Sequence, residues 1–230
     1  MDFTVVWDNL TYFMIGRFPH GPLGGLALTL YLAVVSCLLS FIGGLLLGLL
    51  SVARNPLIRW GTLALVNVLR GVPLLMVVFW SYFLLPALLG QPVGEANTVI
   101  VALTLFTSAY MCGIVRAGIE GVPRGQSEAA LSTGLKPWQV MAFVVLPQAL
   151  RNMVPSLVNQ LVSLIKDTSL AFIVGVSELT HVATQVNNRT MVFPTEIFIF
   201  VALLYFLVCE VLTWLSRRLE RRLAQRQPTA

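Results

Sequence analysis

The sequence predicts an all-α protein that crosses a membrane about five times. Of its 230 residues, 57% are hydrophobic and only 11% are charged, whereas a soluble domain has about 25% charged residues. The mean hydropathy is +0.83. A helix needs roughly 20 apolar residues to cross a bilayer core, so a chain of this length provides one bundle of five or six spans.

The long apolar runs place the individual spans. Two of the runs are interrupted, the second by Arg70-Gly71-Val72-Pro73 and the fourth by Pro147 and Pro155. A shorter apolar patch, at 170–176, follows the fourth run. The expected spans are residues 23–52, 57–89, 96–119, 140–165 and 197–215.

The distribution of basic residues favours five spans over six. Lys and Arg gather in the connections after the first, third and fifth runs, whereas the connection after the second has none. Basic connections favour the cytoplasmic side. Five spans therefore put the N-terminus outside and the basic C-terminus inside the cell, whereas six would place both on one side. The expected organisation is an N-terminal periplasmic or interfacial segment (1–22), a transmembrane domain (23–215) and a basic cytoplasmic tail (216–230).

The sequence lacks the motifs of several catalytic, nucleotide-binding and metal-binding sites. The GxxxxGK[ST] loop that cradles phosphates is absent, and so are H-E-x-x-H and paired intramembrane aspartates. The three cysteines lie in apolar runs without metal-ligand spacing, which favours packing roles. Most of the net charge of +5 sits in the tail. We therefore expect no catalytic residue, no metal site, no cofactor in this chain and no nucleic-acid partner.

The polar segment 124–135 lies on the cytoplasmic side in this arrangement. Pro123 suits a helix start because its missing N–H would be unpaired there. Gly134 suits the left-handed position just past a helix end, and Pro137 suits the first turn of the next helix. Two short helices are expected, the first of them outside the lipid. Small side chains such as Ala129 and Ala130 would let a soluble partner approach closely.

A family resemblance emerges from the same segment. Glu128-Ala129-Ala130, Gly134 and Leu146-Pro147 match the spacing of the EAA motif of ABC importer permeases. The stretches LRGVPLL (69–75), IVRAGIEGVPRGQSEAA (114–130) and KDTSLAFIVGVSEL (166–179) are similar to polar amino acid permeases of the histidine, glutamine and glutamate type. The resemblance covers roughly residues 22–218.

The resemblance implies a fold and a set of partners. The expected fold is the type I ABC importer permease with a cytoplasmic coupling helix, in the bacterial inner membrane. Two permeases, identical or sister chains, would form the pathway through the lipid. ABC ATPase subunits, which bind ATP and Mg²⁺, would lie below, and a periplasmic or lipid-anchored binding protein would deliver the amino acid from above.

The resemblance also implies which residues couple transport to ATP hydrolysis. These are Arg124, Glu128, Ala129, Ala130 and Gly134. Glu128 could pair with a basic residue of the ATPase groove. Alternatively, Glu128 is a solvated charge that interacts favourably with the dipole of its own helix.

Arg70 is a candidate for the substrate pathway. It lies eleven residues beyond Arg59, about 17 Å along a helix and so near the middle of a core roughly 30 Å thick. A central arginine is costly unless it faces protein or water. Arg70 would either help to hold a substrate carboxylate or pair with a carboxylate of a neighbouring span.

The resemblance places Asp167 and Thr168 in the central pathway as well. The carboxylate of Asp167 could bind a substrate ammonium group, whereas Lys166 would point elsewhere and snorkel. Glu178 is expected on an outer surface that meets the binding protein. In span one, Gly44 and Gly48 either allow close helix approach or simply reflect how common glycine is in membrane helices.

One departure from the family bears on the cargo. Gly113 stands where many relatives carry a glutamate in A-Y-x-x-E-I-x-R. Either a sister subunit supplies the substrate site, or the cargo is not a basic amino acid. The predicted function is therefore the permease of an ATP-driven importer for an acidic or neutral amino acid. The alternatives are an ATP-independent secondary transporter or channel, and an intramembrane enzyme.

Overall fold

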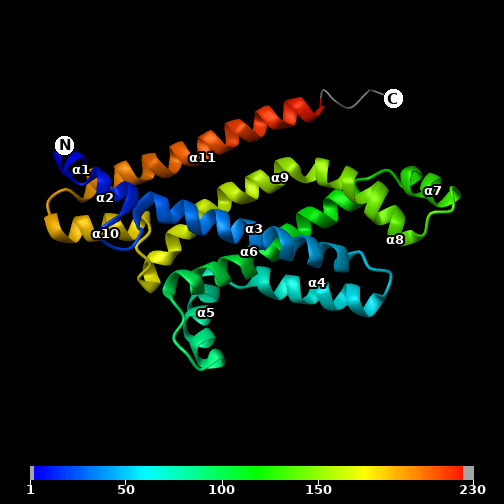
Figure 1. Ribbon diagram of the computed structural model, residues 1–230, viewed down its shortest axis with the longest axis horizontal. Coiled ribbons are helices and arrows are strands. Elements are labelled where there is room, and N and C mark those ends of the chain that lie inside the picture. The colour runs from blue at the N-terminus through cyan, green and yellow to red at the C-terminus, as the bar shows by residue number, and fades with distance from the viewer. Residues whose placement is uncertain (1–2, 225–230) are drawn as a thin grey trace.

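The computed structural model describes residues 3–224, and the side chains of residues 3–218. Over this part of the chain every regular element is a helix (Figure 1), which confirms the all-α prediction. The elements are α1 (Thr4–Asp8), α2 (Leu10–Ile15), α3 (Gly25–Ser51), α4 (Pro56–Gly71), α5 (Leu74–Leu89), α6 (Glu95–Glu120), α7 (Arg124–Ser132), α8 (Pro137–Gln139), the π-helical η1 (Val140–Val145), α9 (Leu146–Asp167), the 3-10 helix η2 (Thr168–Val174), α10 (Leu179–Thr190) and α11 (Pro194–Ala224).

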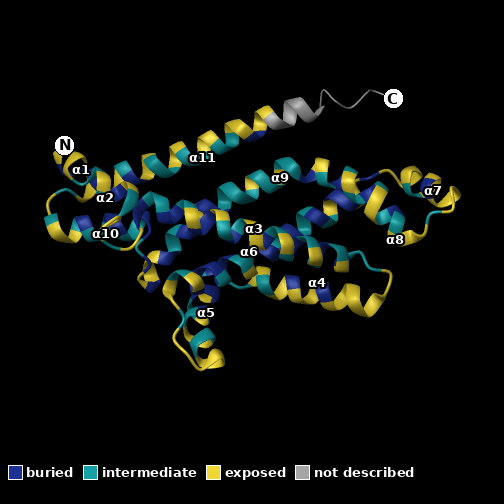
Figure 2. Ribbon diagram, viewed as in Figure 1, coloured by how far each residue is buried: buried dark blue, intermediate teal, exposed yellow. Residues whose placement is uncertain are grey.

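Five membrane crossings fit these helices. α3, α6, the run from α8 through η2, and α11 are each long and apolar enough to cross a bilayer. The pair α4 and α5 passes the same test only when the two helices are taken together, and the pair is bent by 100°. The described residues therefore provide four crossings, or five if this bent pair is one span. α6 is the most buried of the long spans and α11 the least (Figure 2). α6 is therefore the central helix, and α11 presents most of its apolar surface outward.

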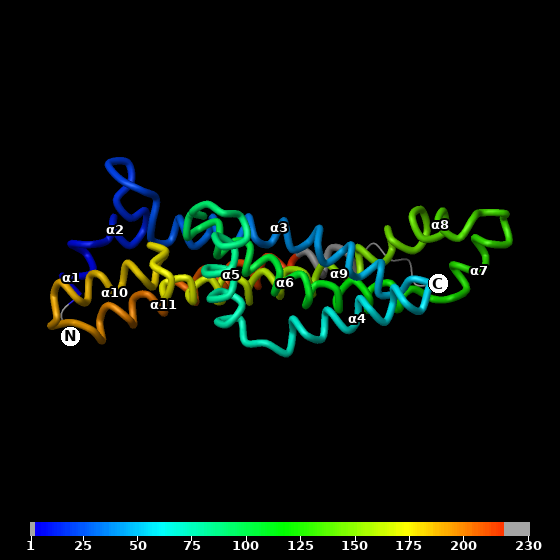
Figure 3. Tube along the Cα trace, turned by 90° about the horizontal axis from the view of Figure 1, so that it is seen from below, coloured from blue at the N-terminus to red at the C-terminus, as the bar shows by residue number. Residues whose placement is uncertain are grey.

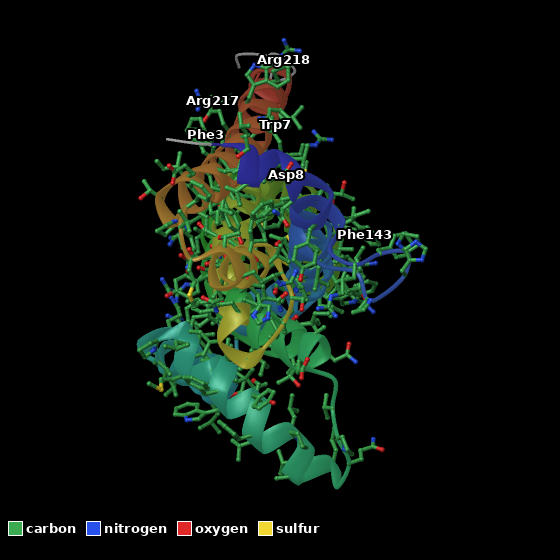
Figure 4. The ribbon with its side chains drawn as sticks, turned by 90° about the vertical axis from the view of Figure 1, so that its left-hand side faces the viewer. Phe3, Trp7, Asp8, Phe143, Arg217 and Arg218 are labelled. Carbon is green, nitrogen blue, oxygen red and sulfur yellow. The ribbon has the colours of Figure 1, made fainter. Side chains whose placement is uncertain are left out.

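The sharp bend in the second span has a local cause. Val72 adopts an extended backbone, with φ −95° and ψ 135°, because the ring of Pro73 disfavours helical geometry in the preceding residue. Pro73 also has no N–H to continue the α4 hydrogen bonds. As a result α5 projects away from the other helices, as Figure 4 shows along the long axis. The sequence predicted an interruption here, but not this projection.

Small residues bring α3 and α6 into close contact. A Cβ on Gly44 would lie 2.3 Å from Met111 Cβ, and one on Gly48 would lie 2.3 Å from Val115 Cγ1. Beside this seam, the Ser40 hydroxyl donates to the Thr104 carbonyl at 3.3 Å. Close approach and interhelical hydrogen bonds replace the hydrophobic effect as the source of helix association in lipid. The close-approach interpretation of Gly44 and Gly48 is confirmed.

The fourth span is continuous although it contains two prolines. The N–H of Leu146 bonds to the Met141 carbonyl, five residues back, which is the π-helical pattern. Pro147 follows at once, so its missing N–H falls in the first turn of α9. Pro155 lies inside α9 without ending it. The π-helical turn therefore absorbs the interruption that the sequence indicated.

The two ends of the bundle differ in character (Figures 1 and 3). At one end, α1 and α2 pack on α10 and the beginning of α11 around the fully buried Phe13. The Tyr12 hydroxyl donates to Gln185, and the Arg189 guanidinium lies 5.4 Å from the Tyr12 ring centre. α7 and α8 form the opposite end. α1 lies at the first of these ends, and α11 runs from there toward the other (Figure 1).

Candidate functional site

The segment resembling a coupling helix forms a hairpin at one tip of the molecule (Figure 3). α7 begins directly after Pro123 and ends before Gly134. Gly134 has φ +87°, a left-handed conformation that side chains with a Cβ rarely adopt. The N–H of Lys136 donates to Gln139 Oε1 at 2.8 Å and so starts α8. The predicted helix–turn–helix geometry is confirmed.

The residues of α7 face two different directions. Arg124, Glu128 and Ala129 are exposed. Glu128 has no ion-pair partner among the side chains of residues 3–218. Ala130, by contrast, is only 9% exposed and packs in a cluster with Val140 and Val145. Ala130 therefore attaches α7 to η1, whereas Ala129 lies on the exposed face.

A polar groove opens between α4, α6 and α9, inside the region expected to span the membrane. Its volume is about 580 Å³. Arg70 supplies its only permanently charged side chain, and Asn152, Ser156 and Gln160 supply neutral hydrogen-bonding groups. The remaining lining residues are Tyr110, Gly113, Ile114, Ala117, Gly118, Gly121 and Met153. A groove of this size at membrane depth can hold a small polar molecule.

Arg70 occupies the last turn of α4. Its guanidinium carbon lies 4.9 Å from the centre of the Tyr110 ring, a separation typical of a cation–π contact. The part of the chain with described side chains offers no carboxylate within ion-pair distance of Arg70. The alternative of a structural ion pair within this chain is therefore not supported.

A polar stripe runs along α9 on the side that lines the groove. Asn152, Ser156 and Gln160 are spaced four residues apart, which places them on one face of a helix. We did not single these residues out from the sequence. The four-residue spacing was the available signal, and the prolines at 147 and 155 obscured it.

Asp167 continues this stripe toward the end of α9. It lies seven residues beyond Gln160, so it occupies nearly the same face about 10 Å further along. It is half-buried and does not line the groove itself. Thr168 is fully buried, and its hydroxyl donates to the Ile165 carbonyl at 2.6 Å. The structure therefore aligns Asp167 with the groove and turns Thr168 into the protein.

Gly113 lies next to the guanidinium of Arg70. A Cβ built on Gly113 would lie 3.6 Å from Arg70 Nη1 and would meet no other atom within 4 Å. Gly113 follows Tyr110 by three residues, so both face the groove from α6. The departure noted in the sequence therefore falls at a groove-lining position beside Arg70.

Glu178 is buried at the opposite end of the bundle, where it caps α10. It accepts hydrogen bonds from the N–H groups of Thr180 and His181, both at 2.8 Å, and from the Tyr205 hydroxyl at 3.0 Å. Its side chain is 0% exposed. Burial raises the pKa of Glu178 from 4.5 to about 7, against the opposing effect of these donors. The expectation that Glu178 lies on an outer docking surface is wrong, because α11 covers it.

The part of the chain with described side chains contains no cluster of three metal-ligating residues. Cys37, Cys112 and Cys209 are all free thiols within helices. The basic tail extends beyond the described residues, since Arg226 lies outside them and the side chains of Arg221 and Arg222 are not described.

Comparison with known proteins gives concordant matches. Residues 40–225 match the model of a family described as binding-protein-dependent transport system inner membrane component. The chain is 42% identical over 202 residues to the probable glutamine ABC transporter permease protein GlnP of Bacillus subtilis, covering 86% of this chain and 91% of the relative. It is 34% identical over 209 residues to the glutamate/aspartate import permease protein GltK of Escherichia coli O6:H1, covering 88% and 93%.

Solved structures agree with these relatives. The chain matches a chain from the crystal structure of an amino acid ABC transporter with histidines, with a TM-score of 0.84, 28% identity and coverage of 96% and 99%. A chain of the MetNI methionine ABC transporter, in an inward-facing conformation, matches with a TM-score of 0.79 at 23% identity, covering 97% and 99%. The second match supports the fold alone.

Proposed function

This chain belongs to the family of inner-membrane components of binding-protein-dependent transport systems, and we propose that its polar groove is half of an amino acid pathway driven by a separate ATPase. The chain is the membrane-spanning permease of an amino acid ABC importer. ATP hydrolysis belongs to another subunit. The relatives and the solved structures do not support the alternative of a secondary transporter or channel.

The observation that carries the pathway proposal is the groove itself. Polar and charged side chains within a membrane span are costly unless they face water or protein, yet α4 and α9 direct Arg70, Asn152 and Ser156 into one open groove. A water-filled route for a polar solute explains why these polar side chains lie within the spans. Asp167 lies further along the same face of α9 and would act at a second position on the route.

α7 is proposed to dock on the ATPase. It is the outermost element at its end of the bundle (Figure 1), and it exposes Arg124, Glu128 and Ala129. A short helix fixed between two spans can transmit a rigid displacement when the ATPase subunits close around ATP. Ala130 and Gly134 hold the helix in position, and Glu128 remains available to a basic partner residue.

The orientation and the other partners complete the proposal. α7 faces the cytoplasm, and the end formed by α1, α2 and α10 faces outward, toward a periplasmic or lipid-anchored binding protein. A second permease, either an identical copy or a sister chain, supplies the other wall of the groove. The names of relatives include glutamine, glutamate/aspartate and arginine, so the proposed cargo rests on the groove. Its only permanently charged lining side chain is Arg70, and the proposed cargo is therefore an acidic or neutral amino acid.

Site-directed labelling tests both the orientation and the docking. In a background without native cysteines, Ala129→Cys should react with a membrane-impermeant maleimide only from the cytoplasmic side. Adding the cognate ATPase should protect it. Trp7→Cys, which is 71% exposed at the opposite end, is the matched control and should react only from outside. Labelling of residue 129 from outside, or no protection by the ATPase, would refute the proposal.

A further inference from the structure

The groove contains one positive charge that no described side chain of residues 3–218 balances. The Arg70 guanidinium stays charged at all physiological pH values. No other lining residue is permanently charged, and the only ion pairs among the side chains of residues 3–218 are Arg116–Glu120 and Arg217–Glu210. The Tyr110 ring contacts the guanidinium but does not neutralise it. The groove therefore attracts an anion.

Gly113 keeps this charge accessible from the groove. Its missing Cβ position lies 3.6 Å from Arg70 Nη1, with no other atom within 4 Å. The space beside the guanidinium is therefore open on the α6 side. A longer side chain at residue 113 would occupy this space, and an acidic one would pair with Arg70. The absence of a side chain at this position thus leaves the guanidinium free for a ligand.

The rest of the lining is neutral. Asn152, Ser156 and Gln160 can each donate and accept hydrogen bonds, so they can contact an ammonium, an amide or a carboxylate without favouring one charge. An arginine binds a carboxylate through two parallel hydrogen bonds. The charge preference of the groove is therefore set by Arg70 and by whatever stands at residue 113.

We propose that the groove selects a dicarboxylic, net-anionic amino acid over its neutral counterpart, and that Gly113 is the specificity-determining position. An anionic cargo neutralises Arg70, whereas a zwitterion leaves one net positive charge in the groove and a cationic cargo is repelled. This inference rests on the proposed function and narrows its cargo from acidic or neutral amino acids to acidic ones.

Binding of L-glutamate and L-glutamine tests the proposal, because the two molecules have almost the same shape and differ in charge. The assembled permease–ATPase complex in lipid nanodiscs, without nucleotide and without binding protein, is titrated with each radiolabelled amino acid. Leaving out the binding protein separates the selectivity of the groove from that of the delivery step. The wild type should prefer glutamate by at least about tenfold, an amount that one ion pair can supply.

Two substitutions of nearly equal size separate charge from bulk. Gly113→Glu should remove the preference for glutamate, because the new carboxylate neutralises Arg70. Gly113→Gln should keep the preference for glutamate over glutamine, even if both amino acids bind more weakly. Arg70→Met should also remove the preference. Thermal stability of each purified complex is measured in parallel, so that misfolded variants are recognised.

Three results would overturn the inference. These are equal binding of the two amino acids by the wild type, the same loss of preference in Gly113→Glu and Gly113→Gln, and the absence of any amino acid binding to a stable complex. ATP-driven uptake in proteoliposomes with the binding protein is a separate measurement. A wild-type complex that shows no binding preference but still performs ATP-driven uptake would refute the role of Gly113 and leave the proposed function standing.

Discussion

Replacing Gly44 with alanine should loosen the contact between α3 and α6. The new Cβ would lie 2.3 Å from Met111 Cβ, where ordinary contact begins near 3.4 Å, so the two helices must move apart by about 1 Å. Overpacking of this kind costs about 1–3 kcal/mol. Separation also stretches the hydrogen bonds of Ser40 and Ser108, already 3.3 and 3.4 Å long.

The helix propensity of alanine offsets part of this cost, by up to about 1 kcal/mol. Gly61→Ala isolates that gain, because a Cβ on Gly61 meets nothing within 4 Å. The assay is the thermal unfolding midpoint of the purified complex in detergent. For a chain of this size, 1 kcal/mol corresponds to roughly 2–4 °C, so Gly44→Ala should melt several degrees below Gly61→Ala. Equal or higher melting of Gly44→Ala would refute the close-packing argument.

Three further variants probe other parts of the structure. Because the folded pKa of Glu178 is raised from 4.5 to about 7, its contribution to stability is complete below about pH 4.5 and is lost as the pH rises through about 7. The melting midpoint of the wild type should therefore decrease as the pH is raised from 5 to 8. An equally steep decrease in Glu178→Gln would exclude Glu178 as its source. Asp167→Asn should weaken ATP-driven uptake without changing complex assembly on native gels; unchanged uptake kinetics would remove Asp167 from the pathway. Gly134→Ala places a Cβ at φ +87°, at a cost of about 1 kcal/mol, and should reduce both ATPase co-purification and uptake; full activity in this variant would contradict the coupling geometry.

The elements predicted well from the sequence are those specified by neighbouring residues. The ends of α3, α6 and α7 follow from apolar length, proline and glycine, which act within one or two turns. The left-handed conformation of Gly134 and the interruption before Pro73 are of the same kind. Each of these features depends on local sterics, so one sequence is sufficient to locate it.

The features predicted poorly depend on residues far apart in the chain. Glu178 was expected on an outer surface that meets the binding protein, yet Tyr205, 27 residues later, covers it. The buried side of Ala130 is defined by η1, which the sequence does not distinguish from an ordinary helix. The groove required α4, α6 and α9 to be placed together, so Arg70 and Gly113 were identified separately and Asn152, Ser156 and Gln160 were missed.

α7 is held between α6 on one side and α8, η1 and α9 on the other. The π-helical turn η1 at 140–145 makes these two sides unequal in stiffness. α6 runs without a break from Glu95 to Glu120, so the wall carrying Tyr110 and Gly113 is a stiff rod. On the other side, η1 separates α8 from α9 and has the weaker hydrogen-bond geometry of a widened turn. A displacement at the tip formed by α7 and α8 should therefore swing α9 about this turn while α6 stays in place. The groove would then widen and narrow through movement of the α9 wall, while the α6 wall stays fixed.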